Sequence, residues 1–427
     1  MKNADAEPGD RVKITTDDEI LAGKLLESYD KKVILLKLDS GYNLGINKDR
    51  IKTVQVEKKE KKEIDKKNIT QDSSLPGISL IATGGTIASK LDYNTGGVKW
   101  LMNPEDIFSI SPKFFKIAKI NTIEKPFMVA SENMTSKEWQ ILAKKSAELL
   151  NKSENHGLII THGTDTLHFT SAALSFMLLD LNKPVVLTYA QRSTDRGSSD
   201  TSLNLACSAR AAISDIAEVM LVGHATKNDD YCIAIRGTKA RKMHSSRRDT
   251  FRPINDMPIA KIYPEKIETM QEYSKKNAGK VEADTKFEEN IALLKYYPGA
   301  KPQIIDSLVK NGCKGIVVEA TGLGHVATEE SRFNWLPAIK DAIKSGITIC
   351  FAPQTIYGRL DPYVYSPGRK LLDAGVIFLE DMLSETAYVK LGWVLGHTDY
   401  LPKVKEMMLH NYAGEINHRI NDKSFLY

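Results

Sequence analysis

The sequence contains few cysteines and no long hydrophobic segment. Its 427 residues include four cysteines, which are scattered and form no CxxC pair. This pattern argues against a structural zinc site and predicts reduced thiols in a cytoplasmic protein. No apolar run approaches the roughly 20 residues that span a bilayer. The polar segment MKNADAEPGDRVK lacks the apolar stretch of a secretory signal, so we expect no membrane segment.

Net charge and cofactor motifs are also scarce. The formal net charge is only +5, so bulk charge does not indicate nucleic-acid binding. No GxxxxGK[ST] or GxGxxG phosphate loop occurs, and there is no HExxH zinc motif. His162 and His168 lie six positions apart and do not form a metal-binding set. The chain is therefore expected to bind neither a metal nor a nucleotide of its own. Its 42% hydrophobic and 26% charged residues are typical of a soluble globular protein.

One highly charged run divides the chain. Residues 57–67 read EKKEKKEIDKK, and ten of these eleven residues are charged. Such a run cannot bury apolar surface and predicts a solvated linker or an exposed helix. Before it, short β-like runs alternate with turns rich in Asp, Gly and Asn, which predicts a small β-barrel over residues 1–56. The barrel is either a structural appendage or a docking module for RNA or protein. We place the linker at residues 57–75.

After the linker, strand-like runs alternate with helical ones. This alternation predicts an α/β fold with a mostly parallel sheet covered by helices. The run TSKE at residues 135–138 has the spacing of a capping box and should begin a helix. A segment rich in Lys, Glu and Tyr, roughly 263–303, interrupts the alternation. We therefore expect a larger domain over residues 76–290 and a smaller one over residues 303–427.

Two hydroxyl-rich turns end two of the apolar strands. The run ISLIATGGTIAS carries Gly84, Gly85 and Thr86, and the run LIITHGTDTLHF carries Thr164 and Asp165. Open α/β folds bind their ligands at the carboxyl ends of parallel strands. A threonine there could act as a nucleophile, and a neighbouring carboxylate could help polarise it or a water molecule. Together the two turns predict a hydrolytic site.

Each turn also has a simpler interpretation. A Gly-Gly turn is most often a plain connection between elements, because glycine tolerates positive φ. Asp165 or Thr166 could simply cap the helix that follows the second strand. However, a cap needs one residue, and His162, Thr164, Asp165 and Thr166 cluster in this turn.

The segment RGTKARKMHSSRRDTF is strongly basic. Seven Lys and Arg residues fall within the 17 positions 236–252. Three interpretations remain open: a nucleic-acid patch, a solvated face with salt bridges, or a surface from which one lysine turns inward beside Asp165. Burial would lower the pKa of such a lysine and the carboxylate would raise it.

These motifs resemble those of a known family. The runs ATGGTIAS and THGTDT resemble the L-asparaginase family over residues from about 75 to about 400. The N-terminal barrel, the linker, ARKMHSSRRDTF, QTIYGR with VYSPGR, and KLGWVLGHT are similar to the archaeal glutamyl-tRNA(Gln) amidotransferase D subunits within that family. The resemblance implies an asparaginase-like two-domain, parallel-sheet α/β architecture preceded by a small SH3-like β-barrel.

The resemblance also implies roles for individual residues. The family nucleophile corresponds to Thr86, and Lys242 completes a catalytic set with Thr164 and Asp165. Which threonine attacks first stays open. The implied substrate-binding residues are Ser131, Glu132, Gly163 and the lid residue Tyr93.

The implied function is that of a glutaminase subunit. It would hydrolyse glutamine and pass ammonia to a GatE-like partner, which would use ATP and Mg to convert Glu-tRNA(Gln) to Gln-tRNA(Gln). The implied assembly is a homodimer within a heterotetramer. One alternative is a free cytoplasmic L-asparaginase that uses the same residues, and another is a non-catalytic RNA-binding protein on the same scaffold. Selectivity for glutamine over asparagine, the ammonia route and gating by tRNA stay open.

Overall fold

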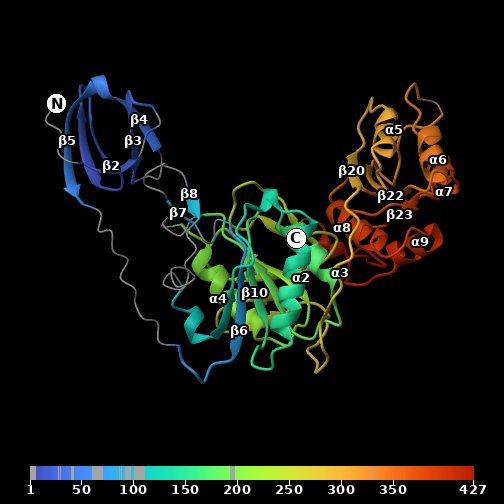
Figure 1. Cartoon of the computed structure of the whole chain (residues 1–427), viewed down its shortest axis with the longest axis horizontal. Helices are drawn as coiled ribbons and strands as arrows, with labels where there is room; N and C mark the ends of the chain where they lie inside the picture. Colours follow the sequence, from blue (N-terminus) through green and yellow to red (C-terminus); the bar gives the residue numbers. More distant parts are fainter. Residues whose placement is uncertain are drawn as a thin grey trace.

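The computed structural model describes residues 6–26, 28, 30–39, 43–59, 71–85, 87, 89–91, 98–100, 111–192, 198–329 and 331–427. Two predicted site residues, Thr86 and Tyr93, lie outside this described part. Figure 1 shows a small N-terminal sheet at one side of the molecule, a large sheet in the middle, and a smaller sheet on the far side.

The N-terminal sheet has five antiparallel strands in the order β4-β3-β2-β1-β5, and it curls on itself in Figure 1. Side chains alternate between buried and half-buried along β1, because successive residues of a strand point to opposite faces. The inward-facing residues form a separate small core, and the predicted small β-domain is confirmed. Its elements are β1 (Arg11–Thr16), β2 (Ile20–Leu26), β3 (Val33–Leu38), β4 (Asn43–Asn47), η1 (Lys48–Arg50) and β5 (Ile51–Lys58).

The large sheet has eight strands in the order β18-β17-β14-β13-β12-β10-β6-β9. The half from β9 to β13 is parallel, as predicted, while β14, β17 and β18 extend it with antiparallel pairs. The strands are β6 (Gly77–Ala82), β9 (Lys119–Glu124), β10 (Leu158–Thr161), β12 (Val185–Thr188), β13 (Val219–His224), β14 (Cys232–Arg236), β17 (Ala260–Ile262) and β18 (Ile267–Thr269).

Helices cover both faces of this sheet. Along β10, Leu158 and Ile160 pack with helices α2 (Ser136–Leu150) and α3 (Leu167–Met177), while Ile159 packs with α4 (Thr201–Ala212) on the opposite face. Both faces are therefore buried, which explains the unbroken apolar runs of the parallel strands.

Two predicted helix boundaries can be compared with the structure. Thr135 begins α2 with the predicted capping box, in which Glu138 reaches back to the Thr135 backbone. The segment DTLHFTSAALSFMLLD after the second turn, which the sequence pattern predicts as helical, is longer than the helix itself. Helix α3 ends at Met177, because Leu178 and Leu179 form β11 and pair with β19 (Glu282–Ala283).

The smaller sheet has four parallel strands in the order β20-β21-β22-β23. Strand β20 lies in the segment that the sequence-based division left between its two larger domains. The strands are β20 (Ile291–Lys295), β21 (Gly315–Ala320), β22 (Thr348–Pro353) and β23 (Ile377–Phe378), and the helices are α5 (Gln303–Lys310), α6 (Leu336–Lys344), α7 (Ser366–Asp373), α8 (Ser384–Leu395) and α9 (Leu401–Leu409).

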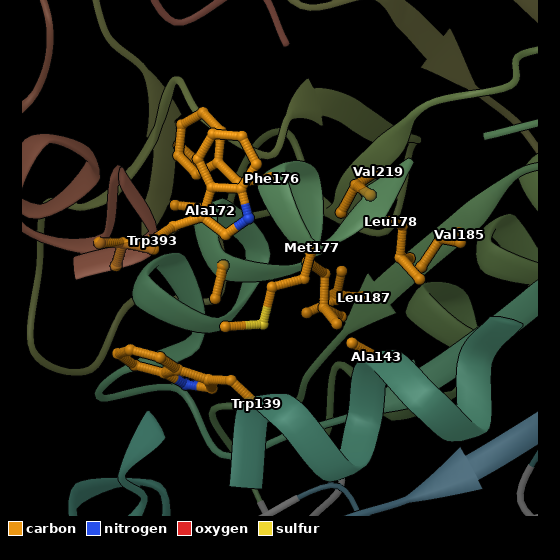
Figure 2. Packing of buried hydrophobic residues seen from close by; sticks show 14 of the residues in the cluster. Trp139, Ala143, Ala172, Phe176, Met177, Leu178, Val185, Leu187, Val219 and Trp393 are labelled. Atoms are coloured by element: carbon orange, nitrogen blue, oxygen red, sulfur yellow. The ribbon is translucent and has the colours of Figure 1, made fainter. Parts of the chain in front are cut away.

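A hydrophobic core continues from the large sheet to the smaller one. Figure 2 shows its centre, where Phe176 of α3 and Trp393 of α8 lie close together. Their rings stack with centroids 6.0 Å apart and an interplanar angle of 24°. The same core includes Val317 and Cys350 from the smaller sheet, so the two parts pack as one unit through α3 and α8.

The remaining elements are short. All four cysteines are buried, and none of them forms a disulfide bond. No helix in the described part of the chain has the length and hydrophobicity that a membrane span requires. The short elements are β7 (Ser89–Leu91), β8 (Val98–Trp100), β15 (Ala240–Lys242), β16 (Phe251–Pro253), η3 (Phe114–Lys116), η4 (Ser131–Asn133) and η5 (Asp422–Ser424).

Candidate active site

The two hydroxyl-rich turns lie side by side at the carboxyl ends of β6 and β10. These strands are parallel neighbours, and Ala82 lies opposite Thr161. The hydroxyl of Thr83 donates a 2.9 Å hydrogen bond to the carbonyl of Thr161. A Cβ added at Gly85, where φ is +89°, would lie 2.5 Å from the nitrogen of Gly163. The backbones of the two turns therefore touch, and only glycine fits at that contact.

A third segment packs against these turns through Ser131. A Cβ at Gly163 would lie 2.8 Å from Ser131 Oγ, so these residues are also in close contact. Ser131 Oγ accepts a 3.2 Å hydrogen bond from the N–H of Asp165, and the Thr166 hydroxyl donates to the Ser131 carbonyl at 2.6 Å. Ser131 is buried, whereas Glu132, the next residue of η4, is exposed. The structure thus brings Ser131, one of the predicted substrate-binding residues, to the second turn, with Glu132 next to it in the chain.

Lys242 reaches the second turn from β15. Its Nζ donates to Thr164 Oγ1 at 2.8 Å and to Asp165 Oδ1 at 2.7 Å. The Lys242 side chain is 13% exposed, whereas that of Asp165 is 64% exposed. The inward-turned lysine that the sequence left open is therefore present. Helix α3 has no side-chain cap, so the structure rejects the capping interpretation of Asp165 and Thr166.

This arrangement suits proton transfer at a hydroxyl. A hydroxyl is a poor nucleophile until a neighbouring base takes its proton. An ammonium group placed between a hydroxyl and a carboxylate can donate a proton to a reacting oxygen, and the neutral amine can accept one. The Thr164, Lys242 and Asp165 side chains can therefore exchange protons next to the place where the two turns meet.

His162 supports the second turn from the interior. The Trp139 indole N–H donates to Thr170 Oγ1 at 3.1 Å, which leaves the Thr170 hydroxyl proton for His162 Nε2 at 2.9 Å. The other ring nitrogen of His162, Nδ1, then donates to the carbonyl of Gly163 at 2.7 Å. Burial lowers the pKa of His162 to about 4. His162 is thus a neutral residue that holds the turn, and sequence reasoning missed this chain of contacts.

His168 gives a test of how these buried histidines titrate. Burial, assisted by the charges of Arg241 and Lys242, lowers its pKa to about 3. Below about pH 6.5, His168 binds a proton in the unfolded chain but stays neutral in the folded chain. Stability is therefore complete above about pH 7 and falls towards acid by about 1.4 kcal/mol per pH unit for such a histidine.

We expect the substitution His168→Gln to weaken this acid sensitivity. Between pH 7 and pH 5 the variant should lose about 2 kcal/mol less free energy of unfolding than the parent chain. Urea unfolding at the two pH values measures the difference. An equal loss in both proteins would contradict the neutral assignment of His168.

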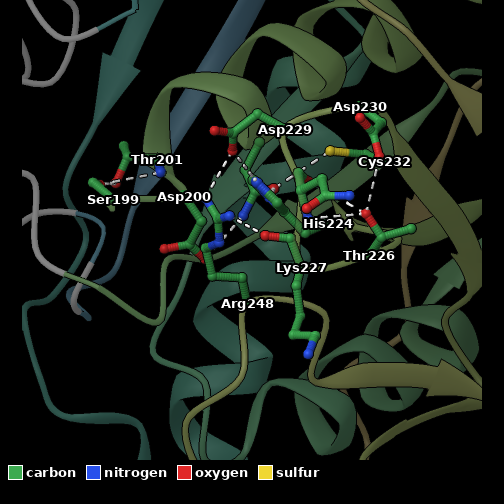
Figure 3. A network of polar contacts seen from close by, with 12 residues as sticks. Ser199, Asp200, Thr201, His224, Thr226, Lys227, Asp229, Asp230, Cys232 and Arg248 are labelled. Atoms are coloured by element: carbon green, nitrogen blue, oxygen red, sulfur yellow. Dashed lines mark hydrogen bonds and ion pairs between the residues drawn. The ribbon is translucent and has the colours of Figure 1, made fainter. Parts of the chain in front are cut away.

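The basic segment is a salt-bridged face. Each of its seven Lys and Arg side chains has a carboxylate within ion-pair distance. Figure 3 shows one example, in which Arg248 contacts Asp229 and the carbonyl of Lys227. Because each of these charges has a partner within the chain, the structure favours the salt-bridged interpretation over the nucleic-acid patch that the sequence left open. The pairs are Arg236–Glu218, Lys239–Asp381, Arg241–Glu385, Lys242–Asp165, Arg247–Asp249, Arg248–Asp229 and Arg252–Asp249.

The structure brings most of the predicted site residues together. Thr164, Asp165 and Lys242 are in direct contact, Gly163 belongs to the same turn, and Ser131 touches that turn. Thr86 and Tyr93 lie outside the described residues, although Gly85 places the start of the Thr86 turn against Gly163. Among the described residues, no group of three or more His, Cys, Asp or Glu side chains could hold a metal ion.

Family models match nearly the whole chain. Residues 77–275 match the N-terminal asparaginase domain, and residues 290–408 match the Glutaminase/Asparaginase C-terminal domain. Residues 6–56 match the GatD N-terminal domain. The chain therefore combines these two asparaginase domains, called the asparaginase body below, with a domain that takes its name from an amidotransferase subunit.

Solved structures share the fold of the asparaginase body. The thermostable L-asparaginase from Thermococcus kodakarensis superposes with a TM-score of 0.72 at 28% identity, and the match covers 80% of this chain and 100% of that one. L-asparaginase I from Vibrio cholerae matches with a TM-score of 0.69 at 27% identity, over 81% of this chain and 100% of that one. These matches confirm the asparaginase-like α/β fold.

Curated relatives match the chain over almost its full length. The glutamyl-tRNA(Gln) amidotransferase D subunit of Thermococcus kodakarensis is 50% identical over 400 residues, which cover 92% of this chain and 89% of the relative. The corresponding protein of Pyrococcus furiosus is 48% identical over 441 residues, covering 100% of this chain and 98% of the relative. The chain belongs to the family of glutamyl-tRNA(Gln) amidotransferase D subunits, a branch of the asparaginase family.

Proposed function

We propose that this chain is the glutaminase subunit of a tRNA-dependent amidotransferase. The similarity to amidotransferase D subunits across the full length carries the proposal, because it includes the N-terminal domain. The matches to free asparaginases cover only about four-fifths of the chain. The asparaginase body accounts for an amidohydrolase site, and the extra N-terminal domain accounts for the amidotransferase branch.

The catalytic roles are part of this proposal. Thr86 attacks the side-chain amide carbon of glutamine and forms an acyl-enzyme, and the amide nitrogen takes up a proton and leaves as ammonia. Water then hydrolyses the ester to give glutamate and free Thr86. Thr164, Lys242 and Asp165 move the protons in both steps, which agrees with their hydrogen bonds of 2.7–2.8 Å.

Substrate binding uses the other residues around the second turn. Ser131, Glu132 and Asp165 hold the α-amino and α-carboxylate groups of glutamine, with Glu132 attracting the α-ammonium, and Gly163 belongs to the same substrate site. The exposed position of Glu132 and Asp165 beside the buried Thr164 supports this role. Tyr93 closes over the substrate as a lid residue.

The remaining steps belong to a partner. A GatE-like subunit receives the ammonia, binds Glu-tRNA(Gln), and uses ATP and Mg to activate the glutamate before amidation. The chain acts as a homodimer within a heterotetramer in the cytoplasm, where its four buried cysteines, which form no disulfide bond, stay reduced. Its domains are residues 1–56, the linker 57–75, the larger domain 76–290 and the smaller domain 303–427, to which β20 is added because it belongs to the same sheet.

Ammonia release tests this function directly. We expect the purified chain alone to hydrolyse glutamine slowly, and the rate on glutamine to rise when the GatE-like partner and Glu-tRNA(Gln) are added. Asparagine serves as the matched substrate, because it lacks one side-chain methylene, a difference worth about 1–3 kcal/mol in a pocket. Rapid hydrolysis of asparagine that does not respond to partner or tRNA would instead identify a free asparaginase.

A further inference from the structure

The strand that carries Lys242 is held from the smaller domain. Lys239 directly precedes β15 and Arg241 lies on it, one on each side of the buried Ala240. Lys239 reaches Asp381, which precedes α8, and Arg241 reaches Glu385, in the first turn of α8. Lys239 Nζ lies 2.8 Å from Asp381 Oδ2, and the guanidinium of Arg241 lies 3.2 Å from Glu385 Oε1. We propose that Asp381 and Glu385 position Lys242 for catalysis, so that the smaller domain sets the geometry of the active site. The inference rests on the proposed role of Lys242.

Asp381 is itself fixed by three parts of the chain. Its carboxylate accepts the backbone N–H of Asn417 at 2.9 Å and the Asn417 side-chain amide at 3.0 Å. Asn255, which follows β16, donates to the carbonyl of Asp381 at 3.2 Å. The Lys239–Asp381 pair has no exposed surface on either side chain. A buried ion pair with these additional bonds resists displacement, because separating the charges would leave each one unpaired in the interior.

Glu385 is fixed in a similar way. It accepts a 3.2 Å hydrogen bond from the Ser384 hydroxyl. The same hydroxyl lies 2.7 Å from a carboxylate oxygen of Glu319, at the end of strand β21. Glu385 Oε1 also lies 3.9 Å from His168 Nε2 on α3, close to the second turn. Through Glu385, β15 is therefore tied to the smaller sheet, and Glu385 also lies beside the helix that begins at the catalytic turn.

The pairs on both sides of Ala240 fix the register of the strand that carries Lys242. Successive side chains of a strand point to opposite faces, so within β15 Arg241 and Lys242 point to opposite faces. Sliding β15 by one residue would turn Lys242 away from Thr164 and would also break both ion pairs. A misplacement of about 1 Å in a catalytic group can cost about 100-fold in rate. The two pairs thus hold Lys242 Nζ between Thr164 and Asp165.

Two substitutions each break the ion pair between Arg241 and Glu385, one by removing the acidic partner and the other by removing the basic partner. We expect Glu385→Gln and Arg241→Gln each to lower kcat for glutamine at least about 10-fold, with KM changed less than about threefold, because neither residue is assigned to the substrate. The matched control is Glu329→Gln, which removes an exposed pair with Lys370 in the smaller domain. It should leave kcat unchanged. All variants are assayed as the full chain with the GatE-like partner and Glu-tRNA(Gln).

The pH profile separates positioning from general loss of structure. Lys242 bonds the carboxylate of Asp165, and both Lys242 and Arg241 lie near the neutral His168, whose Nε2 is 3.9 Å from Glu385 Oε1. Because the two substitutions remove charges of opposite sign from this cluster, the pH profiles of glutamine hydrolysis by the two variants should shift in opposite directions relative to the parent. A protein that was merely loosened would not give opposite shifts.

The outcomes are distinct. Folded Glu385→Gln and Arg241→Gln variants with parental kcat and pH profile would overturn the proposed positioning. If Glu385→Gln does not fold, Arg241→Gln decides, because Arg241 is partly exposed and its loss leaves Glu385 bonded to Ser384. If Lys242→Met loses activity while Glu385→Gln and Arg241→Gln keep it, the positioning role is refuted and the proton relay is retained. Full activity in Lys242→Met would refute the proposed relay itself.

Discussion

Replacing Lys242 with methionine should lower the kcat of glutamine hydrolysis by about 10²–10⁴-fold, the range typical of a lost proton-transfer group. Methionine keeps an unbranched chain of similar length but cannot donate to Thr164 Oγ1 or exchange a proton there. The fold should survive, because Asp165 is 64% exposed and its carboxylate stays solvated when the lysine is gone. Ammonia release at saturating glutamine measures the loss.

A matched control accompanies this substitution. Lys266→Met removes another lysine–carboxylate pair, with Glu268, in which both side chains are exposed and far from the turns in sequence. It should leave hydrolysis unchanged. If Lys242→Met keeps more than about a tenth of the parental rate while its thermal unfolding is unchanged, the proton relay must be assigned to other groups.

Lys390→Met should give the largest loss of stability, about 3–5 kcal/mol. Lys390 is fully buried in α8 and pairs with Glu415 at 2.6 Å, and neither side chain is exposed. Its Nζ also donates to the carbonyls of Met408 and His410. Burial lowers the pKa of Lys390, and the Glu415 carboxylate opposes that change. Removing the lysine leaves Glu415 as an unpaired charge in the interior.

The consequence should extend to the active site. Glu415 holds the tail through the N–H groups of Tyr412 and Ala413, and two residues later Asn417 bonds Asp381. A released tail should therefore reduce glutamine hydrolysis as well as the unfolding temperature. Urea or thermal unfolding, together with limited proteolysis of the tail, measures the effect.

Two controls define what this result means. The double variant Lys390→Met/Glu415→Gln should recover part of the stability, because the unpaired charge is gone. Lys403→Met removes an exposed pair with Glu406 on α9 and should cost less than about 1 kcal/mol. A loss of less than about 1 kcal/mol in Lys390→Met would mean that the buried pair does not fasten the tail.

The sequence by itself determined the local elements and the place of the site. The short β-like runs and turns of residues 1–56, the capping box at Thr135 and the βα alternation are encoded by neighbouring residues, and the structure has the corresponding elements. The two turns could be located because glycines and hydroxyls directly follow apolar strands. Parallel strands bring such turns to one edge of a sheet, so the meeting of Gly85 and Gly163 follows from local pattern and sheet topology.

Only the tertiary structure decided which distant groups touch. Lys242 is 77 residues from Asp165, and whether it turned inward depended on burial and on ion pairs with other parts of the chain. The seven basic residues could form a patch or pair internally, and the positions of their carboxylates favour the internal pairs. The link from Asp381 and Glu385 to β15 has no local signature, because an ion pair depends on distance in space and on dielectric, and neither is encoded by spacing along the chain.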